Sequence, residues 1–234
     1  MATRQIEKWV QKLTCDGTNL QLKINDNRQT MLSVKWGSNL TKVSLHRMFL
    51  KAPKNVMQAV IAYIKREEKN LSKDAKVFIE ERRAALDYSH LVDPERLVVD
   101  GDVYDVQKIY ERLNKRYFKN RLNLQITWFG CHNQKNSSRC SLGLYYDSLK
   151  LIKIHRLLDN SQVPGYVIDF VVYHEMVHAV CPAYIDEKGV HRVHGDEFKE
   201  LEEDFRFYKA ATEWMKKYQM NFFLFTGSKK NGRT

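Results

Sequence analysis

The chain has 234 residues, of which 43% are hydrophobic, and its 39 Lys and Arg outnumber its 28 Asp and Glu to give a formal net charge of +11. This composition excludes a disordered or low-complexity protein, and the count of 10 Gly and 4 Pro excludes collagen-like and linker-like chains. No apolar run approaches the roughly 18 residues of a membrane span. We therefore expect a soluble protein, long enough to bury a sizeable core.

The first residues predict an intracellular, cytoplasmic protein, because charged side chains occupy the stretch that would be apolar in a secretory signal. The cysteines are few and scattered, and none forms a CxxC pair, which excludes a disulfide framework. We expect them to be reduced thiols. They are Cys15, Cys131, Cys140 and Cys181.

Residues 1–100 are expected to form a small α+β region. A helical pattern covers residues 6–13. Three alternating stretches follow and predict short strands; they are residues 20–24, 31–36 and 40–45. A second helix is predicted after Pro53, and Ser72 is a suitable N-cap for a third. The pattern breaks over residues 87–102, which are the candidate domain boundary.

Residues 101–225 are expected to form a second domain, and residues 226–234 a basic disordered tail. An apolar stripe predicts a helix over residues 103–118. Three strands are predicted next, the last two paired as a hairpin; they are residues 124–129, 141–146 and 149–154. Pro164-Gly165 then opens a buried helix, and a single long helix is predicted over residues 195–218. No internal repeat is visible in the sequence.

The buried helix contains the pentad His174-Glu175-Met176-Val177-His178. A spacing of four residues places both imidazoles on one helical face, where they can bind one zinc ion. Glu175 stands beside that face and can take a proton from a zinc-bound water, whose pKa the metal lowers to about 7. A chance pentad is the alternative, but paired histidines in a buried apolar helix would be costly without a partner.

Catalytic zinc usually takes three protein ligands and leaves one position for water. His191 and His194 are the close candidates for the third ligand. His194 is favoured because it begins the final helix, where Phe198 would pack inward one turn later, whereas His191 is more simply a solvated loop residue. The acidic side chains of that helix predict an exposed face; they are Glu197, Glu200 and Glu203. The other histidines carry no comparable spacing: His46, His90, His132 and His155.

The motif His174-Glu175-x-x-His178-Ala179, followed by His194-Gly195-x-x-Phe198, closely resembles that of the SprT-like zinc metalloproteases, a Spartan-related family. Upstream segments resemble the opening helix and the first two strands of that domain. They are Asn114-Lys115-Arg116-Tyr117-Phe118, then Leu122, Ile126 and Trp128, and finally Leu142-Gly143-Leu144-Tyr145. The resemblance covers residues 103–217.

The resemblance implies an α+β, gluzincin-like fold, in which a three-stranded twisted sheet packs on the HExxH helix. It implies a zinc-dependent endopeptidase, with Zn²⁺ held by His174, His178 and His194 and with Glu175 as general base. A protein or peptide substrate would lie along an exposed strand edge.

Two features limit what the resemblance carries over. No oxyanion-stabilising side chain is identified, because Tyr173, Tyr208 and His155 are more simply packing or surface groups. The chain also lacks the C-terminal cysteine cluster of many family members, so no role of that cluster is transferred.

Charge is uneven along the chain. Residues 108–160 carry 11 basic and 3 acidic side chains, whereas residues 186–204 carry 8 acidic and 3 basic ones. The basic stretch 108–156 is interleaved with aromatic residues, a combination that suits phosphate contacts and base stacking. A DNA partner and a solvated basic surface without a partner are both open.

The leading hypothesis is an intracellular zinc endopeptidase that acts on DNA-associated proteins. The alternative from another class is a zinc-containing DNA-binding or scaffold protein without protease activity. A globular protein without a metal is the third possibility. The sequence predicts no membrane partner and does not indicate an oligomeric state.

Overall fold

The computed structural model describes residues 19–27, 30–131 and 141–217. The helix predicted over residues 6–13 and the tail predicted over residues 226–234 lie outside the described residues, as do Cys15, His132 and Cys140. Cys131 and Cys181 are free thiols. Helices and small sheets alternate along the chain, so the predicted α+β class is confirmed.

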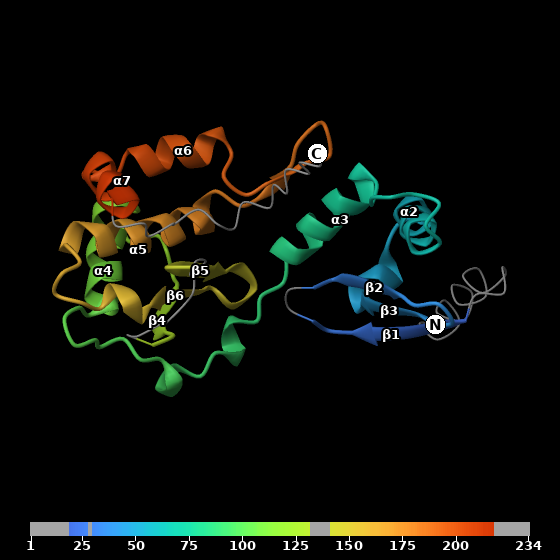
Figure 1. Cartoon of the computed structure of the whole chain (residues 1–234), viewed down its shortest axis with the longest axis horizontal. Helices are drawn as coiled ribbons and strands as arrows, with labels where there is room; N and C mark the ends of the chain where they lie inside the picture. Colours follow the sequence, from blue (N-terminus) through green and yellow to red (C-terminus); the bar gives the residue numbers. More distant parts are fainter. Residues whose placement is uncertain (1–18, 28–29, 132–140, 218–234) are drawn as a thin grey trace. The chain divides into compact units, whose positions relative to one another are not determined.

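The chain divides into two compact units (Figure 1). The first unit comprises Met1–Leu86 together with Tyr184–His191, and the second comprises Asp87–Ala183 and Arg192–Thr234. The second unit is therefore discontinuous in sequence, because the eight residues between its two segments, Tyr184–His191, belong to the first unit.

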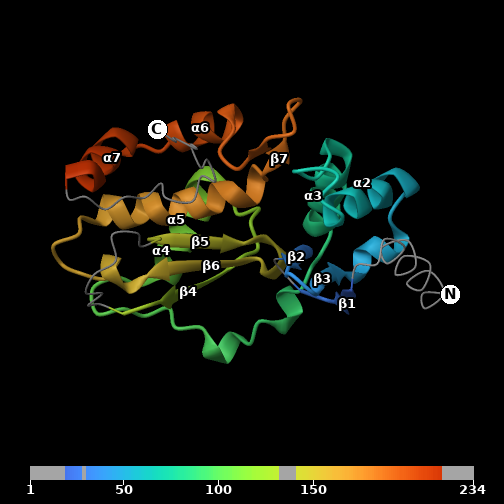
Figure 2. The same ribbon diagram turned by 45° about the vertical axis from the view of Figure 1, so that its right-hand side comes forward.

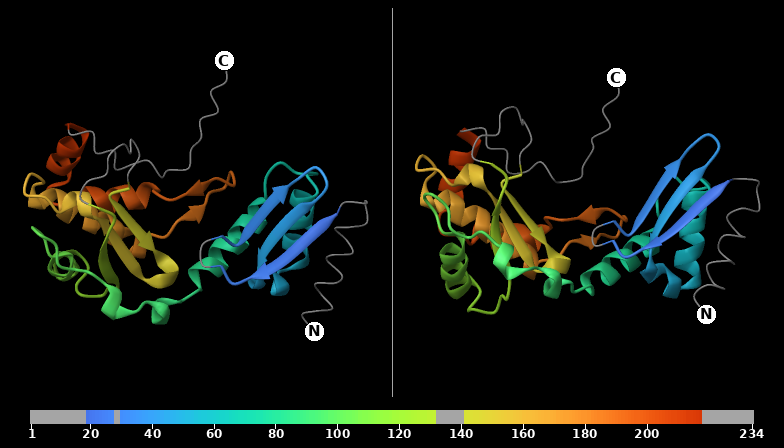
Figure 3. Two further views of the ribbon diagram at one scale, coloured as in Figure 1. Left: turned by 60° about the horizontal axis from the view of Figure 1, so that its bottom comes forward. Right: turned by 90° about the horizontal axis from the view of Figure 1, so that it is seen from below.

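The first unit is a three-stranded sheet with helices on one face (Figure 3). Its strands have the order β1-β3-β2, with β3 parallel to β1 and antiparallel to β2. They are β1 (Leu20–Asn25), β2 (Leu32–Trp36) and β3 (Thr41–His46), which confirms the three predicted strands. Helices α2 (Lys54–Ile64) and α3 (Lys73–Ala84) follow, and the Ser72 hydroxyl caps α3 by accepting from the Ala75 N–H at 3.3 Å.

The second unit contains a sheet of the same size. Its strands are β4 (Gln125–Phe129), β5 (Gly143–Tyr146) and β6 (Leu151–His155), in the order β4-β6-β5. The predicted hairpin is confirmed, because β5 and β6 are antiparallel. The turn between them is a 3-10 helix over Asp147–Leu149, and Lys150 closes it with a φ of 49°.

Helix α5 (Gly165–Val180) packs across one face of this sheet (Figure 2). It begins directly after Pro164, as predicted, and Phe170 to Val177 are buried without a break, since the sheet and other helices cover it on several sides. Helix α4 (Val106–Tyr117) packs against α5. Val103, predicted in the stripe of that helix, precedes it and is 45% exposed, because the helix begins after its cap Asp105.

The prediction of one long final helix is wrong. The structure has α6 (Asp196–Glu203) and α7 (Tyr208–Lys217), separated by four residues that form turns. Phe205 lies in this break and is buried, and its ring lies 5.2 Å from that of Tyr173 and 5.5 Å from that of Phe170. The break places this ring in an aromatic cluster, and its packing outweighs continued helical hydrogen bonding.

Two short strands, β7 (Tyr184–Ile185) and β8 (His191–Arg192), form a hairpin between α5 and α6. Within the described ranges, no helix is long and apolar enough to cross a membrane.

The two units repeat one topology that is not visible in the sequence. In both, the central strand is the third in chain order, parallel to the first and antiparallel to the second. The central strand ends in a histidine, His46 or His155, whose Nδ1 accepts the backbone N–H two residues later at 3.1 Å. A 3-10 turn, a proline and a long helix follow in both units.

The repeat extends to the buried positions of the helix. In α2 these are Val56, Met57, Val60 and Ile64. At the same offsets from the preceding proline, α5 has Val167, Ile168, Val171 and Glu175, all buried. Glu175 thus occupies the place that Ile64 holds in the first unit.

Candidate metal centre

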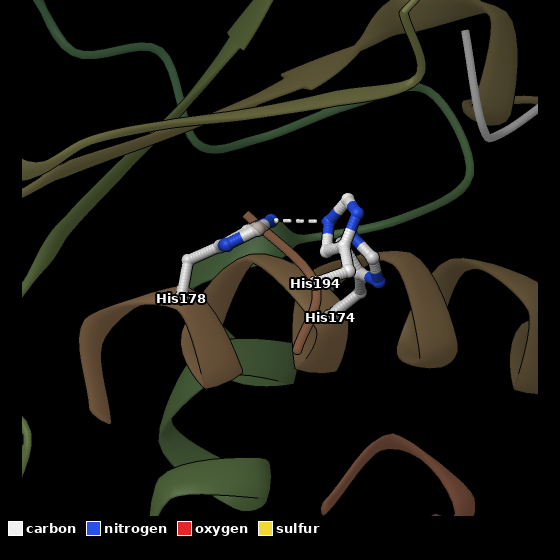
Figure 4. A group of neighbouring side chains, drawn as sticks. All are labelled: His174, His178 and His194. Carbon is white, nitrogen blue, oxygen red and sulfur yellow. Dashed lines mark hydrogen bonds between the residues drawn. The ribbon is translucent and has the colours of Figure 1, made fainter. Parts of the chain in front are cut away.

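Three imidazoles converge in the second unit. His174 and His178 come from α5 and His194 from the segment that leads into α6, and the three rings point toward one another (Figure 4). One nitrogen from each ring lies within 4.8 Å of the others, and His178 Nε2 is 3.2 Å from His194 Nε2. This group could hold a metal ion. His191, the other candidate for a third ligand, instead has its Nε2 3.5 Å from Glu80 Oε1.

The ring of Phe198 packs against all three imidazoles. It is fully buried, and its centroid lies 5.0, 4.6 and 4.5 Å from those of His174, His178 and His194. The expectation that Phe198 packs inward one turn after His194 is confirmed. Contact with a single aromatic side chain therefore restricts the positions of all three imidazoles.

The surroundings keep the imidazoles neutral, which is the form that binds metals. Burial lowers the pKa of His178 to about 2, with a further contribution from the neighbouring His174 and His194. Burial also lowers the pKa of His174 well below its usual value and lowers that of His194, although Glu202 opposes the latter shift. All three rings are therefore unprotonated at neutral pH.

Glu202 of α6 completes the surroundings of His174. Its Oε1 lies 2.6 Å from His174 Nδ1, and both side chains are buried. An ionised Glu202 accepts a hydrogen bond from the Nδ1–H and leaves the Nε2 lone pair for a metal, which is the usual role of a carboxylate behind a ligating histidine. Burial raises the pKa of Glu202 to about 7 when no cation is near. Sequence reasoning missed Glu202, although it follows the inward-facing Phe198 by one helical turn and so shares its face of the helix.

Glu175 is a residue of α5, and its side chain lies against Gly143 of strand β5. It is 5% exposed, and burial raises its pKa to about 8, against a smaller lowering by a hydrogen bond from the backbone of Tyr145. Gly143 permits this approach, since a Cβ at that position would lie 2.5 Å from Glu175 Oε1. A divalent cation beside this carboxyl group would favour its ionised form.

The model of the SprT-like family matches residues 106–217. This segment is similar to the SprT-like family, and we refer to it as the SprT-like domain. No match was found among curated proteins or among solved structures. The matched segment contains all three imidazoles, Glu175 and Glu202. It confirms the family resemblance, and SprT-like proteins are associated with metallopeptidase chemistry.

The three residues considered for oxyanion stabilisation have other partners in the SprT-like domain. The Tyr173 hydroxyl donates to the Leu201 carbonyl at 2.5 Å, and its ring packs against Tyr117 and Phe118. His155 caps the turn after β6, and Tyr208 packs edge-on against Phe170. The acidic residues Glu197, Glu200 and Glu203 are exposed on α6.

Gly143→Ala is expected to destabilise the SprT-like domain by about 1–3 kcal/mol, because its Cβ would overlap the Glu175 carboxylate. Thermal unfolding of the purified protein measures this effect. The matched control is Gly165→Ala, where the nearest atom to a Cβ is Tyr104 Cε1 at 4.0 Å, and we expect a change within about 1 kcal/mol there. Equal melting temperatures for the two variants would contradict the close approach of β5 to Glu175.

Glu202→Gln is expected to weaken zinc binding by about tenfold or more, because the charge that orients the His174 imidazole is lost while side-chain size is kept. Competition with a chromophoric chelator measures the affinity. Glu203→Gln is the control, because Glu203 is exposed and this substitution removes the same negative charge from the same helix. If both variants bound zinc as the parent does, the positioning role of Glu202 would be wrong.

Proposed function

We propose that this protein is a zinc-dependent endopeptidase of SprT-like type with a gluzincin-like active site. The observation that carries the proposal is the convergence of three neutral imidazoles, within 4.8 Å of one another, next to a buried glutamate on the same helix. His174, His178 and His194 would hold the metal, and Glu175 would act as general base.

The donor set supports zinc. Three neutral imidazole nitrogens suit its tetrahedral geometry and leave a fourth position for water or substrate. A bound zinc would lower the pKa of a coordinated water and polarise the scissile carbonyl. The buried Glu202 carboxylate, 2.6 Å from His174 Nδ1, supports a metal centre in which a neighbouring carboxylate orients one of the ligating imidazoles.

The protein's own part in the reaction falls to Glu175. Its carboxylate would take the proton from the attacking water and pass it to the leaving amine. Burial between α5 and β5 restricts the side chain and excludes bulk solvent, which keeps the acceptor oxygen aimed at one place. Its raised pKa in the metal-free protein reflects this dry environment.

Strand β5 supports an extended polypeptide as substrate. At the opposite edge of the sheet, β4 is covered, since the Trp128 N–H donates to the Val98 carbonyl at 2.8 Å. Among the described residues, β5 pairs only with β6, which leaves its other edge for main-chain hydrogen bonds with a substrate. Gly143 of the same strand lies against Glu175.

The test is cleavage of an unfolded protein such as casein by the full-length, zinc-loaded chain. We expect fragments to accumulate, cleavage to stop with a chelator, and activity to return when zinc is restored. Zinc-loaded protein that leaves the substrate intact would instead support a scaffold or binding protein with a structural metal.

A DNA partner is the second proposal, and one surface supports it. Four cations, Lys115, Arg116, Lys119 and Arg121, are exposed around the C-terminal end of α4. The aromatic residues support stacking on bases less well, because Trp128 is buried and its Nε1–H donates to the Val99 carbonyl, and Tyr117 is partly buried against the core. We therefore propose phosphate contacts without base readout, by which the enzyme would reach DNA-associated proteins.

Salt dependence tests this partner. Four phosphate contacts predict that the logarithm of the affinity for single-stranded DNA falls against the logarithm of salt concentration with a slope of about −3. Replacing the four cations by glutamine should flatten that slope. Binding that ignores both salt and the substitutions would exclude this surface.

A further inference from the structure

The sheet of the first unit has two unlike faces. On one face, Val43 and Leu45 of the central strand are buried in an apolar cluster that includes residues of α2 and α3 (Figure 3). Successive side chains of a strand point to opposite faces, so Lys42 and Ser44 lie on the other face. Lys42 is exposed there. The side of the sheet away from α2 and α3 is therefore accessible at its central strand.

Each of the three strands places one exposed lysine on this open face: Lys23 on β1, Lys35 on β2 and Lys42 on β3. Lys35 lies directly opposite Lys42, and Lys23 lies two residues along from Gln21, the other partner of Lys42. The three strands contain no acidic residue. Within the described ranges, none of these lysines forms an ion pair. The face thus carries positive charge that the protein does not neutralise.

Folding does not account for this charge. Two like charges directly opposite one another on neighbouring strands destabilise a sheet. The second unit has the same topology, and its register, counted from the histidine that ends each central strand, gives uncharged residues at the three corresponding positions. They are Thr127, Tyr146 and Leu151. The topology forms without lysines at these positions, so their presence in the first unit points to a ligand.

The other side chains of the open face indicate which anion fits. Those that alternate with the core residues of the strands are hydrogen-bonding groups, and Asn25 Nδ2 donates to Ser44 Oγ at 2.6 Å. Trp36 lies on the opposite face, where its Nε1–H donates to the Ile64 carbonyl at 2.8 Å. A face of lysine, amide and hydroxyl groups suits phosphate oxygens, but it offers no apolar surface for a membrane and no ring for stacking on bases.

We propose that this face binds the phosphodiester backbone of a single-stranded nucleic acid. Neighbouring strands lie about 4.8 Å apart, so the lysines cover a width of about 10 Å, across which one strand can bring consecutive phosphates to them. In the described part of the first unit, the helices pack on the other face, so this face has no helix to enter the groove of a duplex. The site is separate from the proposed metal centre and from the four cations around the end of α4.

The experiment compares variants of the full chain. The sheet variant combines Lys23→Gln, Lys35→Gln and Lys42→Gln. Its control removes the same charge from three exposed lysines of the same unit that lie outside the three strands; they are Lys51, Lys54 and Lys69. Fluorescence anisotropy measures the affinity for oligothymidylate and oligouridylate of about eight nucleotides over a range of salt concentrations. A DNA duplex of equal length and vesicles containing phosphatidylserine are measured in parallel, and thermal unfolding is recorded for every variant.

We expect the sheet variant to bind oligothymidylate about tenfold more weakly than the parent and to flatten the salt slope by about 2, because three phosphate contacts are lost. The two oligonucleotides should bind equally, since the contacts are with phosphate. Arginine at the three positions should restore the affinity, and the control should stay within about twofold of the parent. The sheet variant should melt no lower than the parent, because a pair of like charges is removed.

Equal losses in the sheet variant and its control would overturn the site, because net charge alone would then explain the binding. Tighter binding of the duplex or of the vesicles than of the oligonucleotides would overturn the proposed ligand. The glutamine variant of the four α4 cations separates this inference from the DNA partner proposed above. If only that variant loses affinity, the open face is not a binding site. If only the sheet variant loses affinity, the open face is supported and the α4 surface is excluded.

Discussion

Glu175→Gln is expected to abolish peptide cleavage while zinc binding stays intact. Glutamine keeps the size and packing of the side chain between α5 and Gly143 but cannot accept the proton from the attacking water. Loss of a general base costs about 10²–10⁴-fold in rate. Initial rates of casein cleavage and the zinc content of the same preparation measure the two properties together.

The control is Glu197→Gln, because Glu197 has the same chemistry but is exposed on α6 near the site. It should cleave at close to the parental rate. A Glu175→Gln variant that cleaved as fast as the parent would remove Glu175 from the mechanism. Loss of zinc together with activity would show that the carboxylate supports the metal site and not proton transfer.

His194→Ala is expected to weaken zinc binding by about 10³-fold or more, because one of three protein ligands disappears and the remaining pair on α5 binds a metal poorly. The measurement is competition against chelators of graded affinity. Cobalt provides a second readout, since its visible absorption reports whether coordination stays tetrahedral.

His191→Ala is the matched control for this prediction, because both residues were candidates for the third ligand and lie three positions apart. His191 Nε2 lies 3.5 Å from Glu80 Oε1, and His191 is not one of the three converging imidazoles, so we expect zinc affinity within a few fold of the parental value. A larger loss for His191→Ala than for His194→Ala would reverse the assignment of the third ligand.

The sequence predicted best what depends on local spacing. The pentad on α5 needs only helical periodicity to bring two imidazoles and a carboxylate to one region, and the strands and caps follow from alternation and from residues such as Ser72. The final helix was predicted as one piece because its apolar periodicity continues through the break. Only the tertiary aromatic cluster around Phe205 shows why the chain turns there.

Features that depend on contacts between distant residues could not be predicted from the sequence. Glu202 lies on the same helix as three exposed glutamates, and only its packing against α5 separates it from them. The shared topology of the two units depends on strand pairing between distant residues, which different side chains satisfy equally well. The assignment of Tyr184–His191 to the first unit likewise follows from contacts across more than a hundred positions.

The two units share one sheet topology, but among the described residues only the second unit has the three converging imidazoles. In the first unit, the sheet and helix enclose their own core with isoleucine at the glutamate position and with tyrosine at that of the first imidazole. Among its described residues, the core of this unit is apolar, and burial of these side chains stabilises the scaffold. The SprT-like domain repeats this scaffold, so we expect it to fold without the proposed metal. A cell short of zinc would then contain a folded protein that lacks the proposed peptidase activity until zinc binds.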